Sequence, residues 1–158
     1  MAVEGPLDRA LGFAYRSLAR RDRTEVEVRR HLQVRDVEPE IAEEALAVLA
    51  EQGYVDDARY ARRFAEDRRR LDAWGSERIE RQLLAAGVAP EHVEGALAAQ
   101  ESGWELEAAV ALLRRRFPQP PDDDRGRSRA LGVLVRRGYD LELAHDAVRA
   151  HERGSGVA

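Results

Sequence analysis

The sequence contains neither cysteine nor lysine among its 158 residues. The absence of cysteine excludes disulfide bonds, thiolate metal sites and cysteine nucleophiles. No apolar run is long enough for a signal peptide or a membrane span. These absences predict a cytoplasmic protein that does not enter a membrane.

Aromatic residues are also scarce, at 6%, whereas charged residues make up 35% of the chain. This composition favours helices with narrow apolar stripes over a sheet with a thick core. The net charge of −4 argues against general affinity for DNA or an anionic membrane. The charge is uneven, because residues 109–158 carry 10 arginines against 7 carboxylates. The C-terminal third is therefore the part best suited to meet a polyanion.

Apolar residues recur with helical periodicity along nearly the whole chain. Pro6 and Pro39 are placed to open helices. Thr24 followed by Glu27 is a capping-box pattern, which predicts a helix that runs to about Val34. Gly53 is placed to end the helix that Pro39 opens. A group of three helices is thus predicted before residue 56.

The same pattern recurs 51 residues later. The segment "HLQVRDVEPEIAEEALA" at 31–47 aligns without gaps with "QLLAAGVAPEHVEGALA" at 82–98, and "VLVRRGYDLELAHDAVR" at 133–149 continues the series. We therefore predict an all-α protein, an elongated array of three tandem three-helix repeats that resemble helix-turn-helix units. The predicted ranges are 1–55, 56–103 and 104–152 for the repeats, and 153–158 for a disordered tail.

No arrangement typical of catalysis is found. There is no glycine-rich phosphate loop, and no histidine has a partner at HExxH spacing. The adjacent Asp56 and Asp57 could serve acid–base chemistry only in an apolar pocket that separates their pKa values. The stronger interpretation is that Asp56 caps the helix that follows and Asp57 interacts with its dipole. We predict a protein that is not an enzyme and has no metal or cofactor.

Arginines gather at the predicted C-terminal end of the first helix of every repeat. The three clusters are Arg20, Arg21 and Arg23; Arg68, Arg69 and Arg70; and Arg114, Arg115 and Arg116. The helix dipole explains one such cluster. A cluster at the same place in three repeats suggests a ridge of positive charge for a partner, and a solvated helix face is the alternative.

Four segments resemble one known family. They are "RALGFAYRSLARRDRTEVEVRRHL" at 9–32, "LAEQGYVDDARYARRFAEDRR" at 49–69, "WGSERIERQLLAAGV" at 74–88 and "LVRRGYDLELAHDAV" at 134–148. On these segments the chain resembles RecX, the family of regulatory proteins of the RecA recombinase. The element "GYVDDARYA" at 53–61 is the most specific part of the resemblance.

The resemblance implies a protein without enzymatic activity that binds RecA and lies in the groove of the RecA–DNA filament. Such a protein lowers the ATPase, strand-exchange and coprotease activities of RecA, which limits recombination and the SOS response. Weak direct contact with DNA is expected, and the protein is expected to be a monomer in solution. Position and charge alone suggest the contact residues, which are Arg20, Arg21, Arg23, Arg59, Tyr60, Arg63, Arg68, Arg69, Arg70, Arg114, Arg115, Arg116, Arg125, Arg127, Arg129, Arg136 and Arg137.

Two other interpretations stay open. Each repeat could be a DNA-binding helix-turn-helix with a recognition helix in the major groove. Glu77 and Glu80 speak against this, because they lie on a second helix where basic or polar base-reading side chains are expected. The chain could also be a helical scaffold for an unrelated protein partner.

Overall fold

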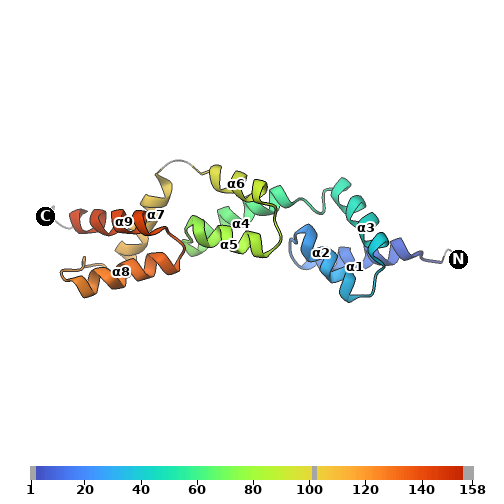
Figure 1. Ribbon diagram of the computed structural model, residues 1–158, viewed down its shortest axis with the longest axis horizontal. Helices are drawn as coiled ribbons and strands as arrows, with labels where there is room; N and C mark the ends of the chain where they lie inside the picture. Colours follow the sequence, from blue (N-terminus) through green and yellow to red (C-terminus); the bar gives the residue numbers. More distant parts are fainter. Residues whose placement is uncertain (1–2, 101–102, 155–158) are drawn as a thin grey trace. The chain divides into compact units, whose positions relative to one another are not determined.

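A computed structural model describes residues 3–100 and 103–154 of the chain, and this part contains nine α-helices and no strand (Figure 1). The helices are α1 (Pro6–Arg20), α2 (Glu25–Val34), α3 (Pro39–Glu51), α4 (Asp57–Asp72), α5 (Ser76–Ala85), α6 (Pro90–Ala98), α7 (Trp104–Arg116), α8 (Asp124–Arg136) and α9 (Leu141–Gly154). The prediction of an all-α fold is confirmed, as are the helix starts at Pro6 and Pro39.

The predicted helix caps are present. The Glu27 N–H donates to Thr24 Oγ1 at 3.2 Å, and the Thr24 N–H donates to Glu27 Oε1 at 3.0 Å. Asp56 caps α4, because its carboxylate accepts the Arg59 N–H at 3.0 Å. Gly53 follows α3 with a φ of +80°, a left-handed conformation that favours glycine. The local signals in the sequence therefore define these helix ends.

The chain forms two compact units. The first comprises Met1–Arg63 and Leu83–Gly95, and the second comprises Phe64–Gln82 and Ala96–Ala158. Helices α4, α5 and α6 contribute residues to both units, so the boundaries of the three repeats stay a prediction. Helix α9 extends into the predicted tail through Arg153 and Gly154, and residues 155–158 lie outside the described part.

Each unit has its own apolar core. In the first unit α1 packs against α2 and α3, and in the second α9 packs against α7 and α8 (Figure 1). Leu32, Leu83 and Leu134, which are 51 residues apart, are all fully buried. Their common burial means that the second helix of each repeat presents the same face to a core.

Within the first unit, the start of α2 is held by residues far along the chain. The Thr24 hydroxyl, which is fully buried, donates to the Ala86 carbonyl at 2.6 Å. The Glu25 N–H donates to the Asp57 carboxylate at 2.9 Å. Gly87 has a φ of +88°, and a Cβ there would lie 2.5 Å from Val26 Cβ. The first N–H groups of a helix have no partner within the helix. In α2 the Asp57 carboxylate accepts one of them, the Glu25 N–H.

Within the second unit, the start of α5 is held in the same way 51 residues later. The Gly75 N–H donates to the Arg137 carbonyl at 2.8 Å, and the Glu77 N–H donates to the Gly138 carbonyl at 3.0 Å. The Glu105 carboxylate accepts the Ser76 N–H at 2.7 Å, as Asp57 does for Glu25 in the first unit. A carboxylate and a turn carbonyl thus hold both helix starts.

The start of α8 is held by its own loop. Asp123 caps the helix by accepting the Gly126 N–H at 2.7 Å, and Pro121 lies so close that a Cβ on Gly126 would be 2.8 Å from Pro121 Cβ. The preceding helix, α7, ends at Arg116, directly before the proline-rich segment 118–124. The start of α8 is thus held by residues of its own preceding loop, whereas the starts of α2 and α5 also contact residues far along the chain.

Candidate partner-binding surface

Three consecutive arginines end α7. Arg114, Arg115 and Arg116 are all exposed, and no ion pair to them occurs within the described part of the chain. Positive charge is favourable beside the C-terminal end of a helix, where the backbone dipole is negative. Because they have no internal ion pair in that part, the guanidinium groups can donate to an external carboxylate or phosphate, which arginine binds in a bidentate manner.

Other predicted arginines have partners inside their own unit. Ion pairs join Arg21 to Glu27 at 3.0 Å, Arg63 to Asp22 at 3.4 Å, Arg70 to Asp67 at 3.7 Å and Arg127 to Glu152 at 2.7 Å. The Arg23, Arg59 and Arg137 guanidinium groups donate to the carbonyls of Ser17, Gly53 and Asp72. These arginines stabilise turns and helix ends, so only part of their donor capacity remains for a partner.

The cluster at residues 68–70 is not a uniform surface. Arg69 is 7% exposed, with its guanidinium 5.9 Å from the centre of the Trp104 ring, and burial lowers its pKa. Arg68 is half-buried, pairs with Asp72 at 2.5 Å and lies over the rings of Phe64 and Trp74. Arg70 is exposed. Arg69 therefore cannot offer its guanidinium to a partner without leaving the core.

Tyr60 lies beside the charges at the start of α2 in the first unit. Its burial, and then the negative charge of Glu27, raise the pKa of the phenol. Burial alone would raise the pKa of Glu27, but hydrogen bonds from Arg21 and the Thr24 N–H outweigh it and lower that pKa. Tyr60 is thus part of a local polar network, and the structure leaves it partly exposed.

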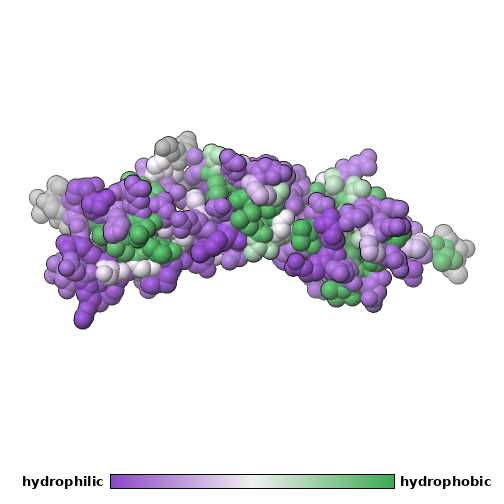
Figure 2. Space-filling model, in the orientation of Figure 1, coloured by the Kyte–Doolittle hydropathy of each residue, from purple (hydrophilic) through white to green (hydrophobic). Residues whose placement is uncertain are grey.

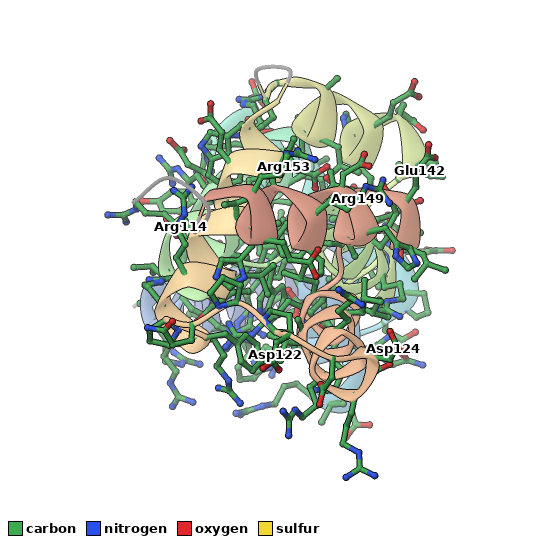
Figure 3. The ribbon with its side chains drawn as sticks, turned by 90° about the vertical axis from the view of Figure 1, so that its left-hand side faces the viewer. Arg114, Asp122, Asp124, Glu142, Arg149 and Arg153 are labelled. Atoms are coloured by element: carbon green, nitrogen blue, oxygen red, sulfur yellow. The ribbon has the colours of Figure 1, made fainter. Side chains whose placement is uncertain are left out.

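The structure adds an arginine that was not predicted. Arg153 lies exposed in the last turn of α9, and Figure 3 shows Arg153 and Arg149 along α9 and Arg114 on α7. Arg149 is paired with Asp146. The signal for Arg153 was available, since it is a cation in a last helical turn like Arg114. It was missed because α9 was expected to end before it.

Four predicted arginines remain. Arg20 is exposed in the last turn of α1, and Arg125, Arg129 and Arg136 are exposed on α8. Figure 2 shows a mainly hydrophilic surface over α8 and α9, with an apolar patch between them. The second unit therefore presents arginines from three helices, α7, α8 and α9.

The paired carboxylates that suggested chemistry have structural partners. Besides capping α4, Asp56 has a pKa lowered by the hydrogen bond from the Arg59 N–H. Burial raises the pKa of Asp57, and its carboxylate holds the start of α2. Among the residues with a described structure, no group of three histidine or acidic side chains could hold a metal ion. No helix in that part is long and apolar enough to cross a membrane.

Comparison with known proteins identifies the first two of the three predicted repeats. Residues 10–49 match the sequence model of "RecX, first three-helix domain", and residues 56–97 match that of "RecX, second three-helix domain". The chain is 38% identical over 136 residues to "Regulatory protein RecX" of Xanthomonas campestris, which covers 85% of this chain and 80% of that one. It is 33% identical to the protein of the same name from Leptothrix cholodnii, with 94% and 93% covered.

Solved structures have the same fold. A crystal structure of RecX from Lactobacillus salivarius superposes with a TM-score of 0.83 at 19% identity, and covers 94% of this chain and 97% of that one. A second crystal structure of regulatory protein RecX gives a TM-score of 0.74 at 22% identity, with 89% and 70% covered. The helical repeat fold is thus shared, and the sequence matches decide the family: the chain belongs to the RecX family of regulatory proteins.

Proposed function

We propose that this chain binds RecA and the RecA–DNA filament and inhibits the ATPase, strand-exchange and coprotease activities of RecA. Membership of the RecX family supports a regulatory role. The exposure of the triplet Arg114–Arg116 is the observation that best supports a contact surface for the partner. A nucleoprotein filament offers repeated binding positions and phosphates, and several weak arginine contacts to it add through effective concentration. The role requires no catalytic group.

The structure supports fewer of the predicted contact residues than position and charge alone suggested. The proposed contact residues are the predicted arginines that are exposed and have no internal carboxylate partner among the described residues, together with Arg153. They are Arg20 in the first unit and, in the second unit, Arg114, Arg115, Arg116, Arg125, Arg129, Arg136 and Arg153. Arg69 is left out because it is buried. The paired arginines and Tyr60 are proposed as secondary contacts, because each would have to give up an existing interaction to bind the partner.

The first experiment adds the purified chain to RecA assembled on single-stranded DNA with ATP and follows hydrolysis. Inhibition at equimolar or lower protein is expected. If equimolar protein leaves the rate unchanged, the proposal fails. Binding to bare duplex DNA that is as tight as binding to the filament would instead favour a helix-turn-helix regulator. Exposed Glu77 and Glu80 on α5 make that result unexpected.

The second experiment reverses the triplet with Arg114→Glu, Arg115→Glu and Arg116→Glu. About tenfold more protein should then be needed for half-inhibition, because three attractive contacts become repulsive. Arg30→Glu, Arg62→Glu and Arg81→Glu change the net charge equally at exposed positions outside the proposed surface. Equal loss in both triple variants would show that net charge, and not this surface, controls binding.

A further inference from the structure

Three exposed arginines of the first unit have no acidic partner. Arg16 and Arg20 lie on α1, the latter in its last turn, and Arg35 is the C-terminal cap of α2. Within residues 3–100 and 103–154, no ion pair involves any of these three guanidinium groups. Their positive charges are therefore not neutralised inside the unit.

The three guanidinium groups gather around one imidazole. The central carbons of the Arg16 and Arg35 guanidinium groups both lie 5.3 Å from the centre of the Phe13 ring. Burial, and then the charges of Arg35, Arg23, Arg20 and Arg16, lower the pKa of the half-buried His31. A charge shifts a pKa strongly only at short range, so the arginines of both helices lie close to His31. We call Arg16, Arg20, His31 and Arg35 the α1–α2 basic surface.

The fold does not require cations at these positions. The equivalent residues 51 positions later are Asp67, Leu71 and Ala86, and the second repeat forms the corresponding helices α4 and α5 with them. The helix dipole favours a cation at the end of α1 or α2, but it does not account for Arg16, which lies a turn before the end of α1. The gathered charge therefore indicates a ligand.

We propose that the α1–α2 basic surface binds the backbone phosphates of single-stranded DNA. Arginine donates two parallel hydrogen bonds to phosphate oxygens, and a row of phosphates suits several guanidinium groups better than a single carboxylate does. Phe13 is half-buried, and two guanidinium groups already lie over its ring. The ring thus orients the arginines and offers no platform for bases, so binding is independent of base sequence.

Two carboxylates beside the surface favour a flexible strand. Asp36 and Glu38 are exposed and line a groove of about 400 Å³ together with Phe13 and Arg35. A stiff duplex across Arg35 would bring further phosphates close to these carboxylates, whereas a single strand can bend away from them. The inference rests on the proposed function only because the RecA filament supplies the strand, and its test uses DNA without RecA.

The first test titrates a short oligothymidylate into the ¹⁵N-labelled full chain and follows the amide shifts. Shifts are expected at residues 13–20 and 31–35. Arg16→Gln, Arg20→Gln and Arg35→Gln together should weaken binding at these amides about tenfold, because three phosphate contacts are lost. Arg30→Gln, Arg62→Gln and Arg81→Gln remove the same charge at exposed positions outside the surface and should leave it unchanged. Equal weakening in both triple variants, or no shifts at these amides in the wild type, would overturn the proposal.

The His31 imidazole gives a second measurement that needs no arginine variant. A bound phosphate adds negative charge beside it, so the pKa of His31 should rise when the oligothymidylate binds. Glu27, one turn earlier on α2, is paired with Arg21 at 3.0 Å. Affinity should therefore increase as the pH falls from about 7 to about 5, and His31→Gln should remove this increase. An imidazole pKa that is the same with and without the oligothymidylate would contradict the site.

Two further ligands test the class of partner. Poly-glutamate at the same charge concentration should shift the same amides much less, and equal shifts would assign the surface to an acidic protein instead. A duplex of the same length should bind more weakly, and tighter binding would exclude a preference for single strands. Inhibition of RecA by a chain that fails these DNA tests would overturn this inference alone and leave the proposed function intact.

Discussion

At the residue scale, the two glycines that follow α5 and α8 do more than end helices. Gly138 has a φ of +97°, and a Cβ there would lie 2.6 Å from the Arg78 backbone nitrogen. Gly138 therefore meets two requirements at once, a left-handed backbone and room for the start of α5. Gly87 meets the same two requirements against Val26. Only the structure shows either requirement at these two glycines.

Gly138→Ala should lower the free energy of unfolding by about 2 kcal/mol or more, because alanine is strained at positive φ and its methyl group collides with Arg78. Gly95→Ala is the matched control. Gly95 lies exposed within α6, where an added methyl group would meet no atom within 4 Å, so alanine should stabilise by about 0.5–1 kcal/mol. Urea unfolding followed by circular dichroism measures both. Similar effects in the two variants would contradict the steric argument.

Thr24 is a buried hydroxyl with two partners, the Ala86 carbonyl and the Glu27 N–H. Thr24→Val keeps the shape but removes both hydrogen bonds, so the free energy of unfolding should fall by about 2 kcal/mol. Thr24→Ser keeps the hydroxyl and should lose much less. Thermal melting of the two variants measures both losses, and equal losses would show that the two hydrogen bonds contribute no more than the methyl group of Thr24.

At the element scale, a carboxylate from one helix holds the start of another. Burial raises the pKa of Asp57 in the folded chain above its unfolded value. The folded state therefore binds the proton more strongly in the window between the two values, and this group's contribution to stability falls as the pH rises through that window. We therefore expect that, at neutral pH, the start of α2 requires a hydrogen-bond acceptor at position 57 and not its negative charge.

Asp57→Asn keeps an oxygen that can accept the Glu25 N–H, so it should change the free energy of unfolding at pH 7 by less than about 0.5 kcal/mol. Asp57→Ala leaves that N–H without its acceptor and should cost about 1 kcal/mol. Stability measured between pH 4 and 7 should also depend less on pH in both variants than in the wild type. A large loss in the asparagine variant would show that the negative charge itself is required.

At the scale of the whole molecule, positive charge gathers in the last turns of α7 and α9. The net charge is −4, yet α7 ends in three exposed arginines and Arg153 lies in the last turn of α9. A chain of this kind is expected to bind a polyanion only weakly by itself. Affinity then depends on a partner that supplies further protein contacts, which agrees with the proposed RecA filament.

The salt dependence of binding to single-stranded DNA reports directly on this charge. If Arg114, Arg115 and Arg116 all contact phosphates, their reversal should reduce the slope of log K against log salt by about 2. Fluorescence anisotropy from low to moderate salt measures the slope, with the Arg30, Arg62 and Arg81 variant as the control. An unchanged slope would assign the triplet to protein contacts instead.

The sequence by itself determined the helices, several of their ends and the family. Proline starts, the Thr24 capping box and Gly53 are local signals, and the 51-residue period comes from apolar residues that face a core. Exposed arginines at the end of α7 also followed from sequence, because helix ends and charge can both be read locally.

Only the tertiary structure decided which groups meet across long sequence separations. It showed that the Asp57 carboxylate accepts the N–H of Glu25, and that Arg69 is buried beside Trp104. It also showed that Asp123 caps α8 and that Pro121 packs against Gly126 in its first turn. Periodicity gives the face on which a residue lies but not the atoms that face it. A buried arginine and an exposed one therefore look alike in the sequence until the neighbouring helix is in place.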